Sequence, residues 1–94
     1  TKLYLRYNLL ELIEDEGFHN LKNLLDLELS WNRIKSIKEK TFSGLNNLRT
    51  LIIESSYISL IEKGSFDNLV NLYELNLNFN QIVIIQNNFF LLLK

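Results

Sequence analysis

The chain repeats itself every 24 residues, and this period constrains its fold more than any other feature of the sequence. Apolar residues recur at that spacing, and the register is kept along the whole chain. The main columns are Leu3, Leu27, Leu51 and Leu75; Leu5, Leu29, Ile53 and Leu77; Leu10, Ile34, Ile58 and Ile82; Ile13, Ile37, Ile61 and Ile85; and Leu21, Leu45, Leu69 and Leu93. The period predicts one repeat segment over residues 1–94, with units at about 1–23, 24–47, 48–71 and 72–94.

Each unit contains a short stretch in which apolar and polar residues alternate, as in Leu27-Glu28-Leu29. This period of two is typical of a strand with one buried face and one solvated face. Strands of successive units run in the same direction, so each pair needs a crossover. The second half of the unit provides it as an irregular or 3₁₀-like return. If the return side is bulkier, the stack bends with its strands on the concave face.

Two further columns are predicted to be structural. An Asn after each strand can both donate to and accept from backbone groups that no regular ladder satisfies. Ser56 interrupts this column, and a hydroxyl cannot replace both amide roles, so we expect a turn weaker by about 1 kcal/mol. The Phe column is expected to fill the convex side of the core, with no ligand role. The columns are Asn8, Asn32, Ser56 and Asn80, and Phe18, Phe42, Phe66 and Phe90.

The full unit reads L-x-x-L-x-L-x-x-N-x-L-x-x-L-x-x-x-x-F-x-x-L-x-x and resembles the leucine-rich repeat in its 24-residue, Phe-containing form. Toll-like receptors, Slit and the small leucine-rich proteoglycans carry this form. The resemblance implies an α/β-type repeat solenoid: a right-handed horseshoe segment with a parallel sheet on its concave face. It also implies an extracellular or cell-surface receptor in innate immunity or cell adhesion. Those proteins flank their repeats with Cys-rich caps, whereas this chain has no Cys and no N-x-[ST] sequon, so a cytosolic origin stays open.

Composition disfavours two classes of partner. Ten basic and eleven acidic residues leave a net charge of −1, and no basic run is long enough to attract nucleic acid or an anionic membrane. The longest apolar runs, residues 82–85 and 89–93, are far shorter than the roughly 18 residues of a membrane span. We therefore expect no nucleic-acid partner and no membrane insertion by this segment.

Metal and triad chemistry are also disfavoured. His19 is the only His and no Cys accompanies it, so a Cys/His metal cluster or dyad has no basis. The acidic run at residues 14–16 could in principle bind a hard cation. The equivalent positions 38–40, 62–64 and 86–88 carry mixed or uncharged residues, which favours a solvated loop.

A carboxylate pair is the remaining catalytic candidate. Glu28 and Glu54 are expected to lie near each other on the inner face, in a geometry that could serve acid and base roles. We expect Arg6 and Arg33 to lie close enough to neutralise them. The sequence thus predicts neither an enzyme nor a cofactor.

The outward strand positions instead suggest a binding surface. Large aromatic residues stand beside charged ones, the residue types that dominate protein interfaces. Stacking aligns them as Tyr4, Glu28, Ile52 and Asn76; Arg6, Ser30, Glu54 and Asn78; and Tyr7, Trp31, Ser55 and Phe79. The predicted ligand-binding residues are Tyr4, Arg6, Tyr7, Glu28, Trp31, Arg33, Ile52, Glu54, Asn78 and Phe79.

Two alternatives remain open. The aromatic residues could simply cover the edge of the core, in which case the segment is a structural spacer or dimerisation element without a ligand. Apolar residues at positions that are mostly polar in earlier units also suggest that something covers the last unit, or that the repeat changes shape near its end. Those residues are Val83, Ile84, Phe89, Leu91 and Leu92.

The ends of the repeat segment are expected to favour self-association. An uncapped array leaves apolar core positions bare at each end, which suggests a piece of a longer array. The bare positions are Leu3, Leu5 and Leu10 at one end, and Ile82, Ile85 and Leu93 at the other.

Overall fold

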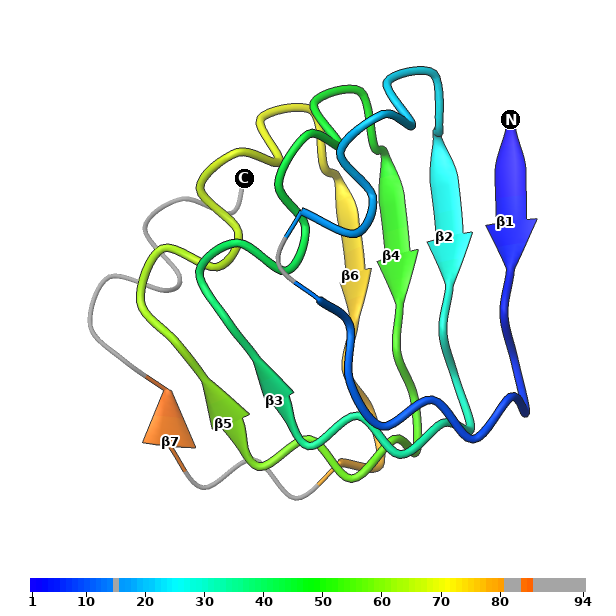
Figure 1. Ribbon diagram of the computed structural model, residues 1–94, viewed down its shortest axis with the longest axis vertical. Helices are drawn as coiled ribbons and strands as arrows, with labels where there is room; N and C mark the ends of the chain where they lie inside the picture. Colours follow the sequence, from blue (N-terminus) through cyan, green and yellow to red (C-terminus); the bar gives the residue numbers. More distant parts are fainter. Residues whose placement is uncertain (15, 81–83, 86–94) are drawn as a thin grey trace.

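The computed structural model describes residues 1–14, 16–80, 84 and 85, and in this part of the chain it contains seven short strands and no helix (Figure 1). Four strands form one parallel sheet in the order β1-β2-β4-β6. Their bounds are β1, Lys2–Tyr4; β2, Asp26–Glu28; β4, Thr50–Ile52; and β6, Glu74–Asn76. The predicted parallel sheet, with one strand from each unit, is confirmed.

The register of this sheet follows the repeat. Leu3 pairs with Leu27, Leu27 with Leu51, and Leu51 with Leu75, so every step is 24 residues. Backbone pairing continues beyond the strand bounds, since the N–H of Trp31 donates to the carbonyl of Glu54 at 3.0 Å. Each unit therefore satisfies the backbone groups of its neighbours well past the central residues.

The return segments form a second parallel sheet, which the sequence did not predict. It contains β3 (Ser36–Ile37), β5 (Leu60–Ile61) and β7 (Ile84–Ile85), in that order. The physical reason is the constant register: equivalent extended residues of successive units lie side by side, and their backbone groups pair. The expectation of a wholly irregular return was therefore wrong for these residues.

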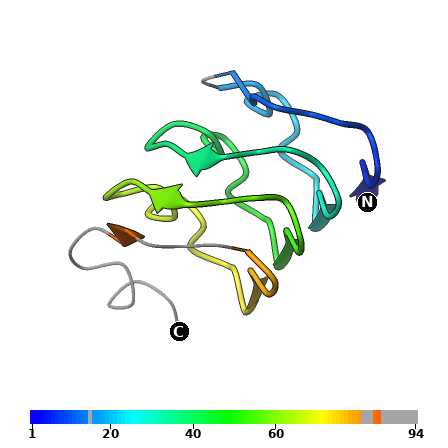
Figure 2. The same cartoon turned by 90° about the horizontal axis from the view of Figure 1, so that it is seen from below.

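Between the second sheet and the next strand of the first, the chain forms a series of tight turns. Backbone N–H groups donate to carbonyls three residues earlier, as from Leu45 to Phe42 at 3.3 Å and from Leu48 to Leu45 at 3.2 Å. These bonds are local, and no continuous 3₁₀ helix forms within the described residues. Figure 2 shows the units as successive loops, with one sheet along each side.

The core lies inside these loops, between the two sheets and the turns. The Phe column stacks through it: the ring centroids of Phe18 and Phe42 are 6.3 Å apart, and those of Phe42 and Phe66 are 6.0 Å apart. Phe90, the fourth member, lies outside the described residues. Other buried side chains are Leu24, Leu27, Leu29, Ile34, Ile37, Leu45, Leu48, Leu51, Ile53, Ile58, Ile61, Leu69 and Leu72.

A buried amide joins the first two units at the turn that follows β2. The Nδ2 of Asn32 donates to the carbonyls of Leu5 and Leu29, both at 2.8 Å. Its Oδ1 accepts from the backbone N–H groups of Asn8 at 3.0 Å and Leu10 at 3.1 Å. One side chain thus satisfies two donors and two acceptors that the strand ladders leave free.

Asn80 makes an equivalent set of bonds with the third unit, and its Oδ1 accepts from the backbone N–H groups of Ser56 and Ile58. Ser56 occupies the same position between them and is fully buried. Within the described residues its hydroxyl oxygen accepts only from the N–H of Asn32, at 3.2 Å, whereas each amide oxygen accepts twice. The third turn therefore makes one accepted bond fewer, which agrees in direction with the weaker turn expected there.

The amide bonds of Asn32 lead to a ranking of two substitutions. Asn32→Ala leaves buried donors and acceptors unsatisfied, so we expect the free energy of unfolding to fall by about 2–4 kcal/mol. Asn32→Ser keeps a hydroxyl like that of Ser56, and we expect about half that loss. Urea denaturation of the two variants beside the unmodified chain measures both values. Equal losses would show that the hydroxyl does not substitute for any amide bond.

Candidate protein-binding surface

The outer face of the four-stranded sheet carries the side chains that point away from the core. Register brings Tyr4, Glu28, Ile52 and Asn76 into one row across the four strands. Tyr4 is largely exposed, whereas Ile52 is half-buried between its neighbours on either side. The row is thus a mixed surface with an aromatic residue at one edge and an aliphatic residue near its centre.

The carboxylates of this face are held by local hydrogen bonds. Oε1 of Glu28 accepts from the backbone N–H of Ser30 at 2.8 Å, and Oε1 of Glu54 accepts from Nδ2 of Asn76. In the described part of the chain, neither is paired with Arg6 or Arg33, so the expected neutralisation was wrong. The physical reason is that polar groups on the same or the adjacent unit satisfy each carboxylate first.

Two other predicted positions differ in their surroundings. Arg6 extends over the ring of Tyr7, with its guanidinium carbon 5.3 Å from the ring centroid, rather than toward a carboxylate. Ser30, placed in the outward row with Arg6, Glu54 and Asn78, is buried at 1% exposure. Its hydroxyl accepts from the N–H of Glu54 at 2.9 Å, which draws it into the space between units. Asn78 is exposed, with its N–H bonded to Oδ1 of Asn76.

An aromatic column stands at the turn that follows each strand. Three of its residues come directly before an Asn of the structural Asn column. They are Tyr7, Trp31 and Phe79, with φ values of 59°, 60° and 61°. Ser55 holds the same place in the third unit with φ of 54°. A bulky residue in this left-handed region costs roughly 1–2 kcal/mol, and the conformation turns these side chains outward while the following residue points inward.

Two members of the column already touch. The rings of Tyr7 and Trp31 are stacked, with centroids 5.8 Å apart and planes 18° from parallel. Trp31 remains 49% exposed and Phe79 is 81% exposed. Large apolar area is therefore left in water at the end of the sheet.

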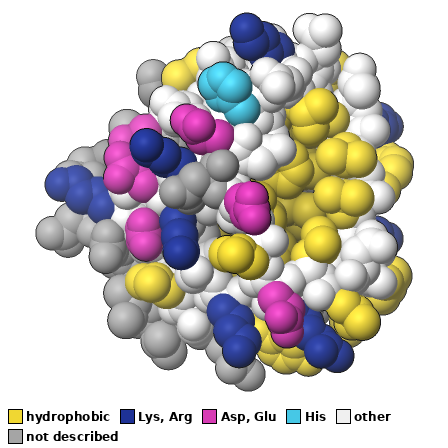
Figure 3. Space-filling model, viewed as in Figure 1, with side chains coloured by type: hydrophobic (Ala, Val, Ile, Leu, Met, Phe, Trp, Pro, Cys, Tyr) yellow, Lys and Arg dark blue, Asp and Glu magenta, His cyan; other side chains and the backbone are white. Residues whose placement is uncertain are grey.

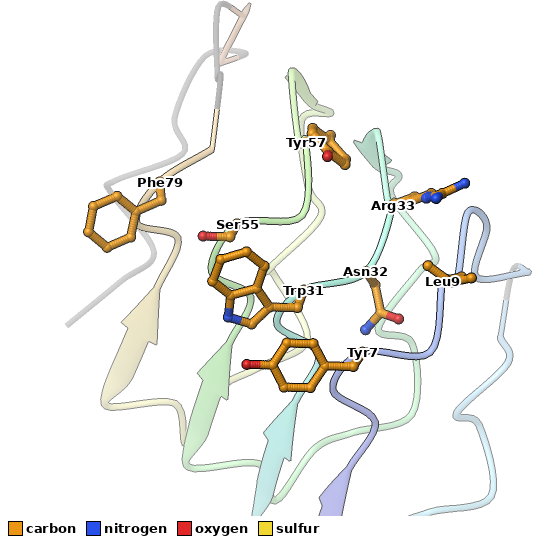
Figure 4. Close-up of a pocket in the computed structure, with 8 residues that line it drawn as sticks. All are labelled: Tyr7, Leu9, Trp31, Asn32, Arg33, Ser55, Tyr57 and Phe79. Carbon is orange, nitrogen blue, oxygen red and sulfur yellow. The ribbon is translucent and has the colours of Figure 1, made fainter.

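This column forms one wall of a groove with a volume of about 340 Å³ (Figure 4). The opposite wall comes from Leu9, Arg33 and Tyr57, two residues further along each turn. Among the described residues that line the groove, Arg33 alone is charged. Its predicted place beside the aromatic column agrees with this geometry, although it lies on the turn rather than on the sheet.

Sequence reasoning missed Leu9 and Tyr57. Both are more than half exposed and have positive φ, at 56° and 64°. The signal was present in the sequence, because the column that contains Leu9, Arg33 and Tyr57 carries large and variable side chains in a polar turn. Arg33 of this column was predicted for its charge, whereas Leu9 and Tyr57 lie beyond the strand positions at which outward residues were expected.

The first unit presents an apolar end face. Leu3, Leu5, Leu10 and Ile13 are only partly buried against the core. Figure 3, which views the molecule from the side of this unit, shows hydrophobic side chains gathered over β1 and the chain that follows it. The corresponding patch predicted for the last unit, at residues 82–85 and 89–93, lies outside the residues whose side chains are described.

The candidate ligands for metal chemistry are dispersed. His19 is exposed, as are Glu14 and Glu16, while Asp15 lies outside the described residues. Within residues 1–14, 16–80, 84 and 85, no group of three or more His, Cys, Asp or Glu side chains is placed to hold a metal ion. The same part of the chain includes no helix with the length and apolar character of a membrane span.

These features define a class: a repeat protein built from parallel strands, with structural residues at fixed positions and variable residues facing outward. A family model described as leucine rich repeat matches residues 1–55, more than half of the 94 residues. The chain belongs to the leucine-rich repeat family. Repeats of this family are non-catalytic and generally mediate protein–protein interactions. No curated protein matches the chain.

The stacked pair at the end of the groove gives a second prediction. A double-mutant cycle of Tyr7→Ala and Trp31→Ala is expected to give a coupling energy of about 0.5 kcal/mol, at the low end for aromatic pairs because both rings are exposed. Urea denaturation of the two single variants and the double variant measures it. Additive effects would mean that the rings do not stack in solution.

Proposed function

We propose that the chain is a non-catalytic recognition module of an extracellular or cell-surface receptor in innate immunity or adhesion. It binds a protein ligand with the outer sheet face and the adjoining groove. One observation carries this proposal: Tyr7, Trp31 and Phe79 keep large exposed rings on a left-handed backbone, where Gly would cost less. Strain retained under exposed side chains is typical of functional sites.

The residue types support the same reading. Aromatic and Arg side chains dominate the energetics of protein interfaces. On this surface, further contact area next to the aromatic column comes from Tyr4, Arg6 and Ile52. Polar groups come from Glu28, Glu54 and Asn78. The 24-residue spacing and the stacked Phe rings support membership of the extracellular, Phe-containing type, with horseshoe curvature that places this sheet on the concave side.

The test is a capture experiment with extracellular fluid and solubilised cell-surface protein, followed by affinity measurement on any ligand that is retained. We expect Trp31→Ala or Phe79→Ala to weaken the affinity at least tenfold, as expected for interface hot spots of about 1.4 kcal/mol or more. Val70→Ala serves as the control, because Val70 is exposed on a return turn away from both surfaces. Equal capture by all variants would favour a structural spacer.

Self-association is a second candidate function, favoured by the apolar end face of the first unit. Leu9 and Leu12 are both more than 60% exposed beside the partly buried leucines. Exposed apolar clusters of this kind mark interaction sites in soluble proteins. A second copy of the chain could cover the cluster.

Sedimentation velocity at micromolar concentration tests this candidate. We expect the unmodified chain to sediment as a dimer or larger species, and Leu12→Lys to shift it toward monomer because a charge cannot be buried cheaply in an apolar contact. A folded monomer before substitution would rule out this role at that concentration.

A further inference from the structure

The aromatic column at the sheet end is interrupted in the third unit. Its members are Tyr7, Trp31, Ser55 and Phe79, and only Ser55 lacks a ring. Figure 4 shows the short side chain of Ser55 between Trp31 and Phe79. Among the described residues, no ring stacks on the second face of Trp31.

The width of this interruption fits one ring. In the three stacked pairs found among the described residues, rings of adjacent units lie 5.8 to 6.3 Å apart. Trp31 and Phe79 are two units apart, and two such steps give about 12 Å, which leaves one stacking distance on each side of an inserted ring. Phe79 is 81% exposed, so its ring is free to rotate onto a guest.

We infer that the groove receives an aromatic side chain of the protein ligand, inserted opposite Ser55 as the missing member of the column. A carboxylate close to it in the ligand sequence pairs with Arg33. This inference rests on the proposed function and specifies the chemical group that the ligand presents.

The charges around the groove select among planar groups. In the described part of the lining, Arg33 is the one charged residue, and it repels a guanidinium that approaches the ring of Trp31. Its partner is therefore an acid. In the described part of the chain, no Lys or Arg forms an ion pair with Glu28 or Glu54 on the neighbouring sheet face, which disfavours the dianionic phosphate of a nucleotide more than a single carboxylate. An aromatic side chain with one nearby carboxylate satisfies both conditions.

Trp31 makes the inference directly measurable, because it is the only Trp of the chain and lines the groove. The probe is the tripeptide N-acetyl-Asp-Gly-Phe-amide, in which an extended backbone places the acid and the ring on one face, about 7 Å apart. It is titrated into the 94-residue chain while Trp fluorescence is recorded. A saturable change in intensity or wavelength is expected.

Three comparison peptides identify the recognised groups. Replacing Phe by Leu is expected to weaken binding about tenfold, since two stacking contacts are lost. Replacing Asp by Asn is expected to weaken it about twofold to fivefold, as for an exposed ion pair. Replacing Phe by Pro keeps a ring in the peptide but removes its π system, so this peptide tests whether aromatic stacking is required. Equal binding of the Pro peptide would overturn the inference of an aromatic guest. Tighter binding of adenosine monophosphate than of the Phe peptide would also overturn it.

A gain-of-ring variant gives the sharpest test. Ser55→Tyr supplies the missing ring from the chain itself, at a position where Tyr7 and Phe79 show that an aromatic residue adopts the required φ. We expect this variant to keep its far-ultraviolet spectrum and midpoint of unfolding but to lose Phe-peptide binding. Asn68→Tyr is the matched control: it adds an exposed ring on a return turn and is expected to leave peptide binding intact.

The outcomes separate this inference from the proposed function. A captured protein ligand that binds Ser55→Tyr as well as the unmodified chain, together with no response of Trp31 to the peptide, would sink the inference and leave protein recognition standing. Peptide binding that Ser55→Tyr abolishes would support the inference even if the capture experiment retained no protein.

Discussion

The structure depends on one kind of contact, the side-chain hydrogen bonds that tie a turn to the unit before it, as made by the buried amide of Asn32. Asn32 offers two donors and two acceptors at a place where the strands have ended and the backbone of two units still needs partners. An apolar residue in that place would leave buried backbone N–H and C=O groups without hydrogen bonds. This costs more free energy than the additional apolar packing would contribute. The 24-residue period is kept because an amide, or in the third unit the hydroxyl of Ser56, must reach the equivalent backbone groups of the unit before it.

The inward direction of that amide determines the surface beside it. When Asn32 points into the core, the residue before it must turn outward, and the backbone does so by entering the left-handed region at Trp31. The same backbone conformation occurs at Tyr7, Ser55 and Phe79, the equivalent residues of the other units. A structural requirement thus places one free position per unit in a row at the sheet end. Aromatic residues in that row form a wall that local packing does not require.

The sequence predicted what periodicity determines. The columns that contain Leu27 and Leu51 gave the parallel sheet and its register, since a repeat of constant length places equivalent residues side by side. It did not predict the second sheet, because two residues such as Ser36 and Ile37 carry no alternation that distinguishes a strand from a loop. It also missed Tyr57, whose exposure follows from turn geometry. Ser30 was misplaced because strand alternation ends at Leu29.

The third unit departs from the repeat at two adjacent residues, and the departures act together. Ser56 weakens the amide ladder, and Ser55 removes a ring from the aromatic column directly before it. Within the described residues, the side chain of Ser56 makes two bonds to the unit before it, whereas Asn32 and Asn80 make three each, and the open space lies beside this same turn. A ring held between Trp31 and Phe79 would connect the second unit to the fourth across this turn. Ligand binding would then add cohesion where the chain itself supplies least, because binding that requires the folded arrangement stabilises it by mass action.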